Sequence, residues 1–179
     1  MDHKLRLLIH AARRDRTVLN ALYAMKNYAV AEAGYTQAAL TLQRAGRPTK
    51  GLVEGRPTTQ RDADQAEMLR LNDHFTPGSF TWANGTYFPT PQFTERMGTL
   101  RLQQEADSIA DNFSAITTHL EQTRDIAESA FEASPTLRGV GFDQVFELVR
   151  MNSGLLEQKL DAMNTGTGEA YRNVGLEPG

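Results

Sequence analysis

One stretch in the second half of the chain places apolar side chains at alternating intervals of four and three residues. Residues with this spacing lie on one face of a helix, and its repetition over successive heptads predicts a coiled-coil seam. Thr94 precedes the stretch and is a residue type favoured at helix N-caps, so we expect a long helix over 94–133. The seam positions are Leu102, Ala106, Ile109, Phe113, Ile116, Leu120, Thr123, Ala127 and Ala130.

Helical character extends to other segments and predicts a mainly α fold. The first part of the chain is rich in alanine, has no proline and contains Gly34 alone among glycines, which predicts one long helix over 2–45. Further helices are expected over 59–72 and 142–163. The apolar stripe of the first helix is Leu5, Leu8, Ala12, Leu19, Leu22, Ala29, Ala33 and Leu40, and that of the last is Phe142, Phe146, Val149, Ser153, Leu156, Leu160 and Met163.

A β-hairpin is predicted over 79–88, between these helical segments. Asn84-Gly85 separates two runs of aromatic and β-branched residues, and a two-residue turn needs positive φ at both positions. Trp82 then faces Tyr87 across the strands, with Phe80 on the same face. Two strands alone are marginal in water, so this aromatic face is expected to pack on the chain's own helices or on another subunit. Its edges could also accept a further strand.

Two segments lack periodicity and are expected to be extended. The motif Gly-Arg-Pro-Thr occurs at 46–49 and again at 55–58, where glycine ends the helix and proline keeps the preceding residue extended. We interpret 46–58 as a linker, with the alternative that it presents Arg47 and Arg56 to a partner. Residues 164–179 are rich in glycine and polar residues and are expected to form a C-terminal tail. The remaining residues, 1–163, then form a single elongated helical domain, a bundle or coiled-coil hairpin with the β-hairpin inserted.

Composition narrows the class of protein. The chain has 40% hydrophobic and 23% charged residues, as soluble globular proteins do. No apolar run approaches the roughly 20 residues that a membrane-spanning helix needs. The basic first residues contain no secretory signal, so cytoplasmic synthesis is expected, with incorporation into a virion or another large assembly as a further expectation. Because the chain has no cysteine, disulfides and thiol chemistry are excluded.

The search for chemistry in the sequence finds no catalytic or metal-binding pattern. The histidines are isolated, with no partner at the spacing that metal sites use. The glycines in the linker do not match a phosphate-binding loop, because Lys and Ser/Thr do not follow Gly51. The many carboxylates between Glu105 and Glu132 are typical of the solvated side of a helix. We therefore expect a protein that is not an enzyme, with no cofactor, no metal and no small-molecule substrate.

Charge is distributed unevenly along the chain. Residues 1–60 hold ten Lys/Arg against four Asp/Glu, whereas residues 61–179 hold nine against eighteen, so a net charge of −3 conceals a basic beginning and an acidic remainder. Arg13, Arg14 and Arg16 could bind nucleic acid or an anionic membrane surface. The favoured interpretation is that this basic segment packs against acidic helices of the same or a neighbouring subunit.

Together these observations predict a non-enzymatic structural subunit of a larger particle, filament or appendage, for example a phage virion component or a secretion-machine part. It is expected to form homo-oligomers and to contact other protein subunits of the assembly. The alternative is an adaptor or effector that binds nucleic acid or an anionic membrane through its basic N-terminal helix. The candidate interaction residues are Phe80, Trp82, Tyr87, Arg13, Arg14, Arg16, Arg47 and Arg56.

Overall fold

The computed structural model describes residues 3–47, 49, 56–73 and 80–173, and in these the chain is mainly helical, as the periodicity predicts. Their contacts divide the chain into two compact units. Unit 1 comprises Met1–Tyr35 and Ala115–Gly179, and unit 2 comprises Thr36–Ser114. The sequence predicts a single domain, whereas each of these units has a hydrophobic core of its own. The two longest helices, α2 (Arg16–Arg44) and α4 (Pro91–Glu132), contribute residues to both units.

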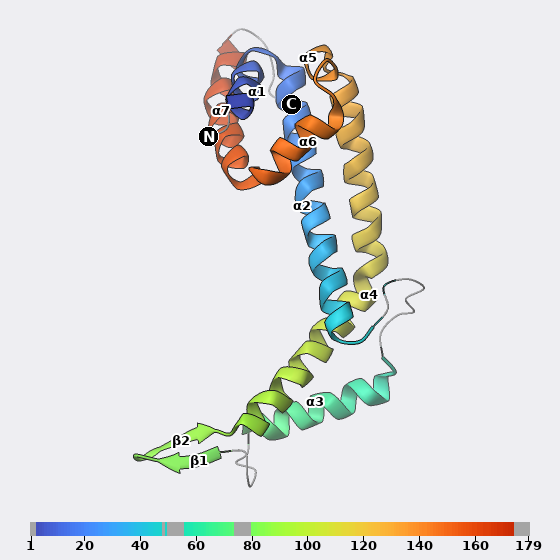
Figure 1. The fold of residues 1–179 in the computed structure, drawn as a ribbon, viewed down its shortest axis with the longest axis vertical. Coiled ribbons are helices and arrows are strands. Elements are labelled where there is room, and N and C mark those ends of the chain that lie inside the picture. Colours follow the sequence, from blue (N-terminus) through green and yellow to red (C-terminus); the bar gives the residue numbers. More distant parts are fainter. Residues whose placement is uncertain (1–2, 48, 50–55, 74–79, 174–179) are drawn as a thin grey trace. The chain divides into compact units, whose positions relative to one another are not determined.

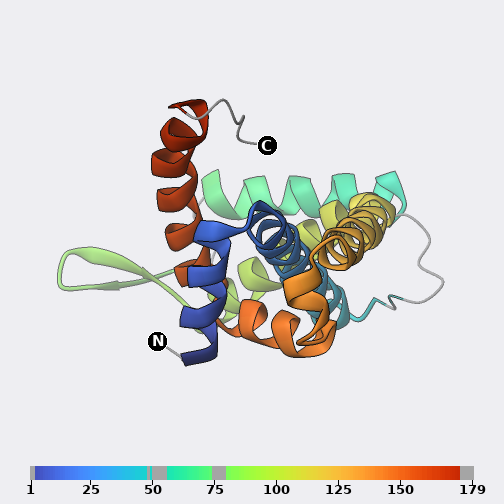
Figure 2. The ribbon, with the colours of Figure 1, turned by 90° about the horizontal axis from the view of Figure 1, so that it is seen from above.

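Unit 1 is built only from helices in the residues described. It contains α1 (His3–Arg14), the beginning of α2, the end of α4, the short α5 (Pro135–Arg138), α6 (Phe142–Met151) and α7 (Ser153–Asn173). Figures 1 and 2 show α1 and α7 side by side next to the beginning of α2. The core takes the apolar face of every one of these helices, including Leu5, Leu8, Leu22, Met25, Ala127, Phe131, Leu137, Val149, Leu156 and Leu160.

The single helix expected over 2–45 is in fact two helices that meet at Asp15. The carboxylate of Asp15 accepts hydrogen bonds from the backbone N–H of Thr17, at 2.9 Å, and from its hydroxyl, at 2.6 Å. An aspartate that bonds the N–H two residues on is a helix N-cap, and so Asp15 starts α2. The expected stripe holds from Leu5 to Ala29 but not beyond, because Ala33 and Leu40 are exposed. A straight helix drifts by about 20° per heptad from a repeat of 3.5 residues, which moves the buried face on to other positions.

The last helix also differs from the expected span of 142–163. A break at Asn152 separates α6 from α7, and the side-chain amide of Asn152 donates to the carbonyl of Leu148 at 2.8 Å. α7 then continues to Asn173, beyond the point at which a tail was expected to begin. The expected seam survives the break, because each of its positions from Phe142 to Met163 is buried or half-buried. Residues 174–179 lie outside the described part of the chain.

Unit 2 combines α3 (Thr58–Asp73), strands β1 (Phe80–Ala83) and β2 (Thr86–Pro89), the end of α2 and the beginning of α4. The strands pair antiparallel with Trp82 opposite Tyr87, the register that a two-residue loop at Asn84 and Gly85 imposes. Both loop residues have positive φ, 51° and 77°. α4 begins at Pro91 rather than at 94. The hydroxyl of Thr90 accepts from the N–H of Phe93 at 3.3 Å, so Thr90 is the N-cap and proline occupies the first helical position, where it is tolerated.

Two small clusters form the core of unit 2. Met68 and Leu71 of α3 pack with Met97 and Leu100 of α4, and Phe93 covers them. Further along, Leu42 of α2 packs with Ala106 and Ala110 of α4. The seam predicted on α4 is therefore used for burial in both units: its positions are buried or half-buried throughout, whereas Ile126, outside the seam, is 60% exposed.

Candidate interaction surfaces

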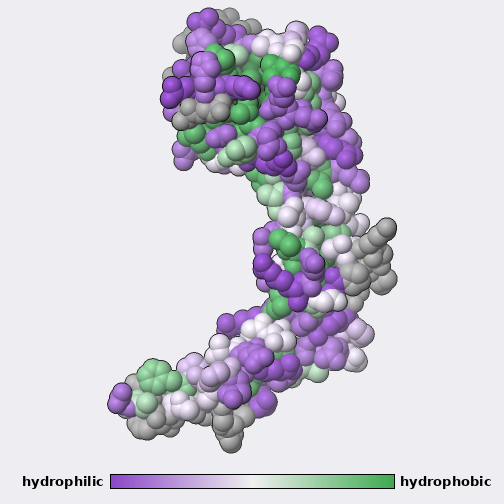
Figure 3. Space-filling model, viewed as in Figure 1, coloured by the Kyte–Doolittle hydropathy of each residue, from purple (hydrophilic) through white to green (hydrophobic). Residues whose placement is uncertain are grey.

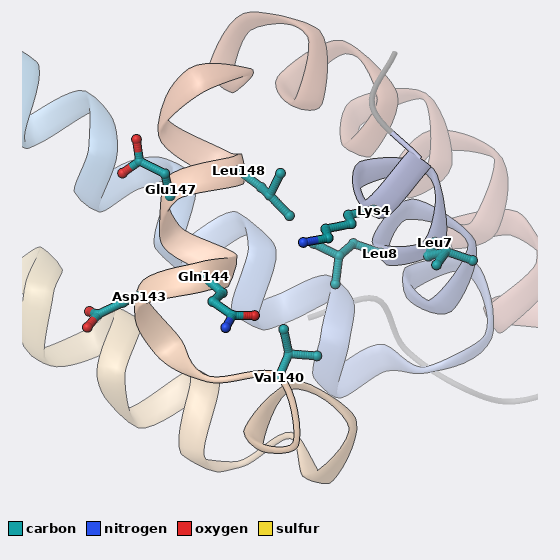
Figure 4. Close-up of a pocket in the computed structure, with 8 residues that line it drawn as sticks. All are labelled: Lys4, Leu7, Leu8, Val140, Asp143, Gln144, Glu147 and Leu148. Atoms are coloured by element: carbon teal, nitrogen blue, oxygen red, sulfur yellow. The ribbon is translucent and has the colours of Figure 1, made fainter.

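An apolar hollow opens on the surface of unit 1 between α1, the turn after α5, and α6 (Figure 4). Its volume is about 630 Å³. We call it the apolar hollow, and its lining residues are Lys4, Leu7, Leu8, Val140, Asp143, Gln144, Glu147 and Leu148.

The way α6 enters the fold explains this hollow. Gly141 has a φ of 103°, a backbone conformation that favours glycine, and it turns the chain from α5 into α6. α6 then buries one face and leaves the neighbouring positions at the surface. In Figure 4, Leu8, Val140 and Leu148 point towards one another across the hollow. Val140 is 43% exposed and Leu7 55% exposed, so the apolar rim is open to solvent.

Opposite charges stand on the two walls of the apolar hollow. Lys4 extends from α1, and Asp143 and Glu147 extend from α6, on its side away from the converging leucines (Figure 4). Glu147 is paired with Arg150, which also contacts Glu32 at 3.2 Å. The space-filling view in Figure 3 shows hydrophobic residues reaching the surface of unit 1 among hydrophilic ones.

A second hollow, of about 430 Å³, lies between α1 and α7 and is basic. α1 is amphipathic, and its buried face consists of Leu5, Leu8, Ile9 and Ala12. The residues on the opposite face of this helix, which also recur at intervals of three and four, are exposed to solvent. Lys159 completes the hollow from α7, and among the residues that the structure describes no carboxylate lines it. We call it the basic hollow, and its lining residues are His3, Arg6, Leu7, Ile9, His10, Arg13 and Lys159.

In unit 2 the main charged feature is an ionic cluster around Asp107 of α4. Asp107 is only 6% exposed. Arg47 donates to one oxygen of this carboxylate, and Arg56 donates to both, at 3.2 and 2.8 Å. Arg56 also contacts Asp64 of α3. Burial raises the pKa of Asp107, but the hydrogen bonds and positive charges of Arg56 and Arg47 outweigh it, so the pKa is lowered to about 2. The cluster thus fixes two arginines of the expected linker, Arg47 and Arg56, to one carboxylate.

The residues expected to mediate interactions fall into different surroundings. Arg13 lines the basic hollow, Arg14 is exposed next to it in sequence, and Arg16 is half-buried at the start of α2. Arg47 and Arg56 both contact Asp107 within the chain. The backbones of Phe80, Trp82 and Tyr87 lie in the paired strands, while their side chains are outside the described part of the structure. The packing of the hairpin face stays a prediction.

Sequence reasoning missed most residues of both hollows. The spacing of His3, Arg6, His10 and Arg13 on α1 is a helical pattern that could have identified one wall of the basic hollow. Lys159 has no sequence signal that connects it to α1, because the two are brought together only by tertiary packing. The same is true of Val140 and Leu148, which reach α1 only in the folded chain.

Two other kinds of feature are absent from the described residues. In the part of the chain that the structure describes, no group of histidine, aspartate and glutamate side chains is arranged to hold a metal ion. None of the described helices combines the length and the apolar character needed to cross a membrane. Comparisons of the chain with protein-family models, with curated proteins and with solved structures found no match.

Proposed function

We propose that the chain is a non-enzymatic subunit of a larger assembly, and that copies of it associate through the apolar hollow. The observation that carries this proposal is an open apolar surface, rimmed by exposed Leu7 and Val140, between walls of opposite charge. Exposed apolar surface is unfavourable in water, and where it gathers in one concave place it is typical of an interaction site.

The chemistry of the apolar hollow favours a protein partner over a small molecule. Sites for small ligands place a few polar groups so that they converge on the ligand and orient it. Here Leu8, Val140 and Leu148 point into the hollow, with the polar ends of Lys4 and Gln144 beside them, whereas Asp143 and Glu147 extend on the other side of α6 (Figure 4). A leucine or another apolar side chain from a partner fits such a surface, with ion pairs at its rim.

Charge favours a second copy of this chain as that partner. Two identical surfaces that meet around a two-fold axis each present the same pair of walls to the other. Lys4 of one copy then approaches Asp143 of the other, and the reverse pair forms at the same time. Complementary charges of this kind fix the orientation of two subunits and exclude wrong pairings.

A particle, filament or appendage needs a second contact, because a two-fold interface closes on itself. The outer edges of β1 and β2 are the surface we assign to that contact. In this proposal the helices pack as an elongated bundle with coiled-coil character along α4, and the hairpin projects from it. A phage virion component or a secretion-machine part is the class of assembly that we favour.

The experiment is light scattering coupled to size exclusion on the full chain and on Leu7→Asp and Val140→Asp. We expect the unaltered chain to be a dimer or larger and each rim variant to be a monomer, because a buried unpaired carboxylate is strongly unfavourable. The matched control is Met151→Asp, which adds the same charge on α6 at a residue that is 73% exposed and does not line the apolar hollow. It should retain the mass of the unaltered chain.

Point substitutions are preferable to removal of α1, because Leu5, Leu8 and Ile9 belong to the core of unit 1. Circular dichroism of each variant establishes that loss of mass does not reflect unfolding. A monomeric unaltered chain contradicts the proposal. So do folded rim variants whose mass equals that of the unaltered chain.

The second candidate function is that of an adaptor or effector that binds nucleic acid or an anionic membrane through α1. The basic hollow favours it, since α1 and α7 gather cations there and the described part of the lining contains no carboxylate. The two functions use different surfaces of unit 1, so that one protein can carry both.

A further inference from the structure

We infer that the basic hollow binds the phosphate backbone of a nucleic acid. Such binding deepens the second candidate function, on which it rests, and does not depend on the proposed self-association. It uses α1 and α7, whereas the proposed self-association uses α1 and α6. Among the described residues, Leu7 alone lines both hollows.

The basic hollow holds an excess of cations that have no ion-pair partner among the described residues. Arg6, Arg13 and Lys159 are exposed, and none of them forms an ion pair with another residue of the described chain. His3 and His10 add ring N–H donors to the same surface. Like charges gathered in one hollow repel one another and produce a positive potential that attracts anions. A polyanion relieves this repulsion, which a neutral ligand does not.

The two acids that flank Lys159 in the sequence of α7 are turned away from the basic hollow. Glu157 contacts Lys26 of α2 at 3.3 Å, and the carboxylate of Asp161 accepts a hydrogen bond from the hydroxyl of Tyr23 at 2.9 Å. Both acids therefore face α2. Lys159, which lies between them in sequence, is left on the side of α7 that lines the basic hollow.

The distance between the two arginines of α1 suits the spacing of phosphates along a nucleic acid. A helix rises by about 1.5 Å per residue, so Arg6 and Arg13 are separated by about 10 Å along α1. Each strand of B-form DNA places one phosphate per about 3.4 Å of axis, so this row of side chains spans about three phosphates. Guanidinium groups bind phosphate oxygens with two parallel hydrogen bonds, which suits Arg6 and Arg13 to this task.

A nucleic acid is favoured over a membrane because the apolar face of α1 is not free. An interfacial helix binds lipid by burying that face among the acyl chains. In α1 the corresponding residues, Leu5, Leu8 and Ile9, are at most 7% exposed and belong to the core. We assign the cations of this lining to phosphates and no side chain to the base edges, so we expect binding without sequence preference.

The test is fluorescence anisotropy with labelled oligonucleotides of about 12 nucleotides, single-stranded and duplex, of mixed sequence. Three contacted phosphates predict that affinity falls by about 20- to 40-fold between about 50 and 200 mM salt. Arg13→Gln and Lys159→Gln should each reduce this fall to about 7- to 12-fold and weaken binding at low salt. Arg124→Gln is the matched control, since Arg124 is exposed on α4 of unit 1 and does not line the basic hollow. It should leave both properties unchanged.

Vesicles of zwitterionic lipid with and without an anionic lipid form the second arm of the experiment. Binding of either oligonucleotide with the expected loss in both variants supports the inference. Three results overturn it: no binding to either oligonucleotide, equal losses in Arg124→Gln and in the two variants, and binding to anionic vesicles alone. Because the variants leave the apolar hollow intact, the oligomeric state reports separately on self-association.

Discussion

At the scale of single residues, the carboxyl group of Asp107 is held in its ionised form although burial opposes ionisation. Arg47 and Arg56 supply the charge and the hydrogen bonds that make this possible. A buried pair whose acid is removed leaves an uncompensated cation. The ionic cluster therefore stabilises unit 2 only as long as all of its members are present.

Asp107→Asn should lower the free energy of unfolding by about 3 kcal/mol, because it removes the charge and keeps the shape. Urea denaturation followed by circular dichroism measures the loss. Asp111→Asn is the matched control on the same helix, since Asp111 pairs with Arg61 at 2.8 Å but its side chain is 41% exposed. Solvent screens such a pair, and its loss should be much smaller. Equal losses in the two variants would show that burial of Asp107 contributes nothing.

The lowered pKa of Asp107 predicts a dependence of stability on pH. Because its pKa in the folded chain, about 2, lies below the ordinary value of 3.8, the unfolded chain binds the proton more readily. Its contribution to stability is complete above the ordinary value and is lost as the pH falls towards 2. Asp107→Asn should lose less stability over that interval than the unaltered chain. Asp107→Asn retains part of the pH dependence of stability, because hydrogen bonds from Arg96 and Arg61 lower the pKa of Glu67 and Asp111 as well. Identical urea midpoints against pH would contradict this assignment.

Two glycines predict opposite effects of the same substitution. Gly85 has a φ of 77° in the hairpin turn, where a Cβ is strained by about 1–2 kcal/mol, so Gly85→Ala should accelerate hydrogen exchange in 80–89.

Gly98 lies inside α4 with nothing within 4 Å of an added Cβ. Gly98→Ala should therefore raise the free energy of unfolding by about 0.5–1 kcal/mol. Unchanged exchange in the first variant, or destabilisation in the second, would be inconsistent with these backbone conformations.

At the scale of helices and strands, the sequence predicts the helical class and the buried seams better than the ends of the helices. Spacing identifies a buried face because burial follows geometry over many residues. The breaks at Asp15 and Asn152 depend on single side chains that bond the backbone, and such bonds compete with helix continuation only locally. Thr90 followed by Pro91 is a recognisable helix start. The sequence nevertheless favours Thr94 as the N-cap, because Thr94 lies nearer to the first position of the seam.

Substitution of Asp15 tests whether its carboxylate is the N-cap that starts α2. Asp15→Ala should lower the free energy of unfolding by about 1 kcal/mol, because the N–H and hydroxyl of Thr17 lose their acceptor. Asp15→Ser retains a side-chain oxygen and should lose less. The measurement is urea denaturation of both variants. If both variants were as stable as the unaltered chain, the carboxylate would have no part in starting α2.

At the scale of the whole molecule, the sequence predicts a charged N-terminal surface but neither hollow. Arg6 and Arg13 belong to the basic segment that the charge pattern identifies, and the structure adds His10 and Lys159 beside them. The apolar hollow could not be predicted, because Leu7 and Val140 are far apart in sequence and neither belongs to a repeat. Surfaces that form between elements depend on tertiary packing, which periodicity does not specify.

Sedimentation velocity on the unaltered chain measures self-association without any substitution. The samples form a wide dilution series at low and at high salt, because oligomers respond to concentration by mass action. We expect a dimer or larger species that dissociates on dilution, and more readily at high salt, since the rim pairs of Lys4 with Asp143 are screened. A single monomeric boundary at every concentration and salt would contradict the account.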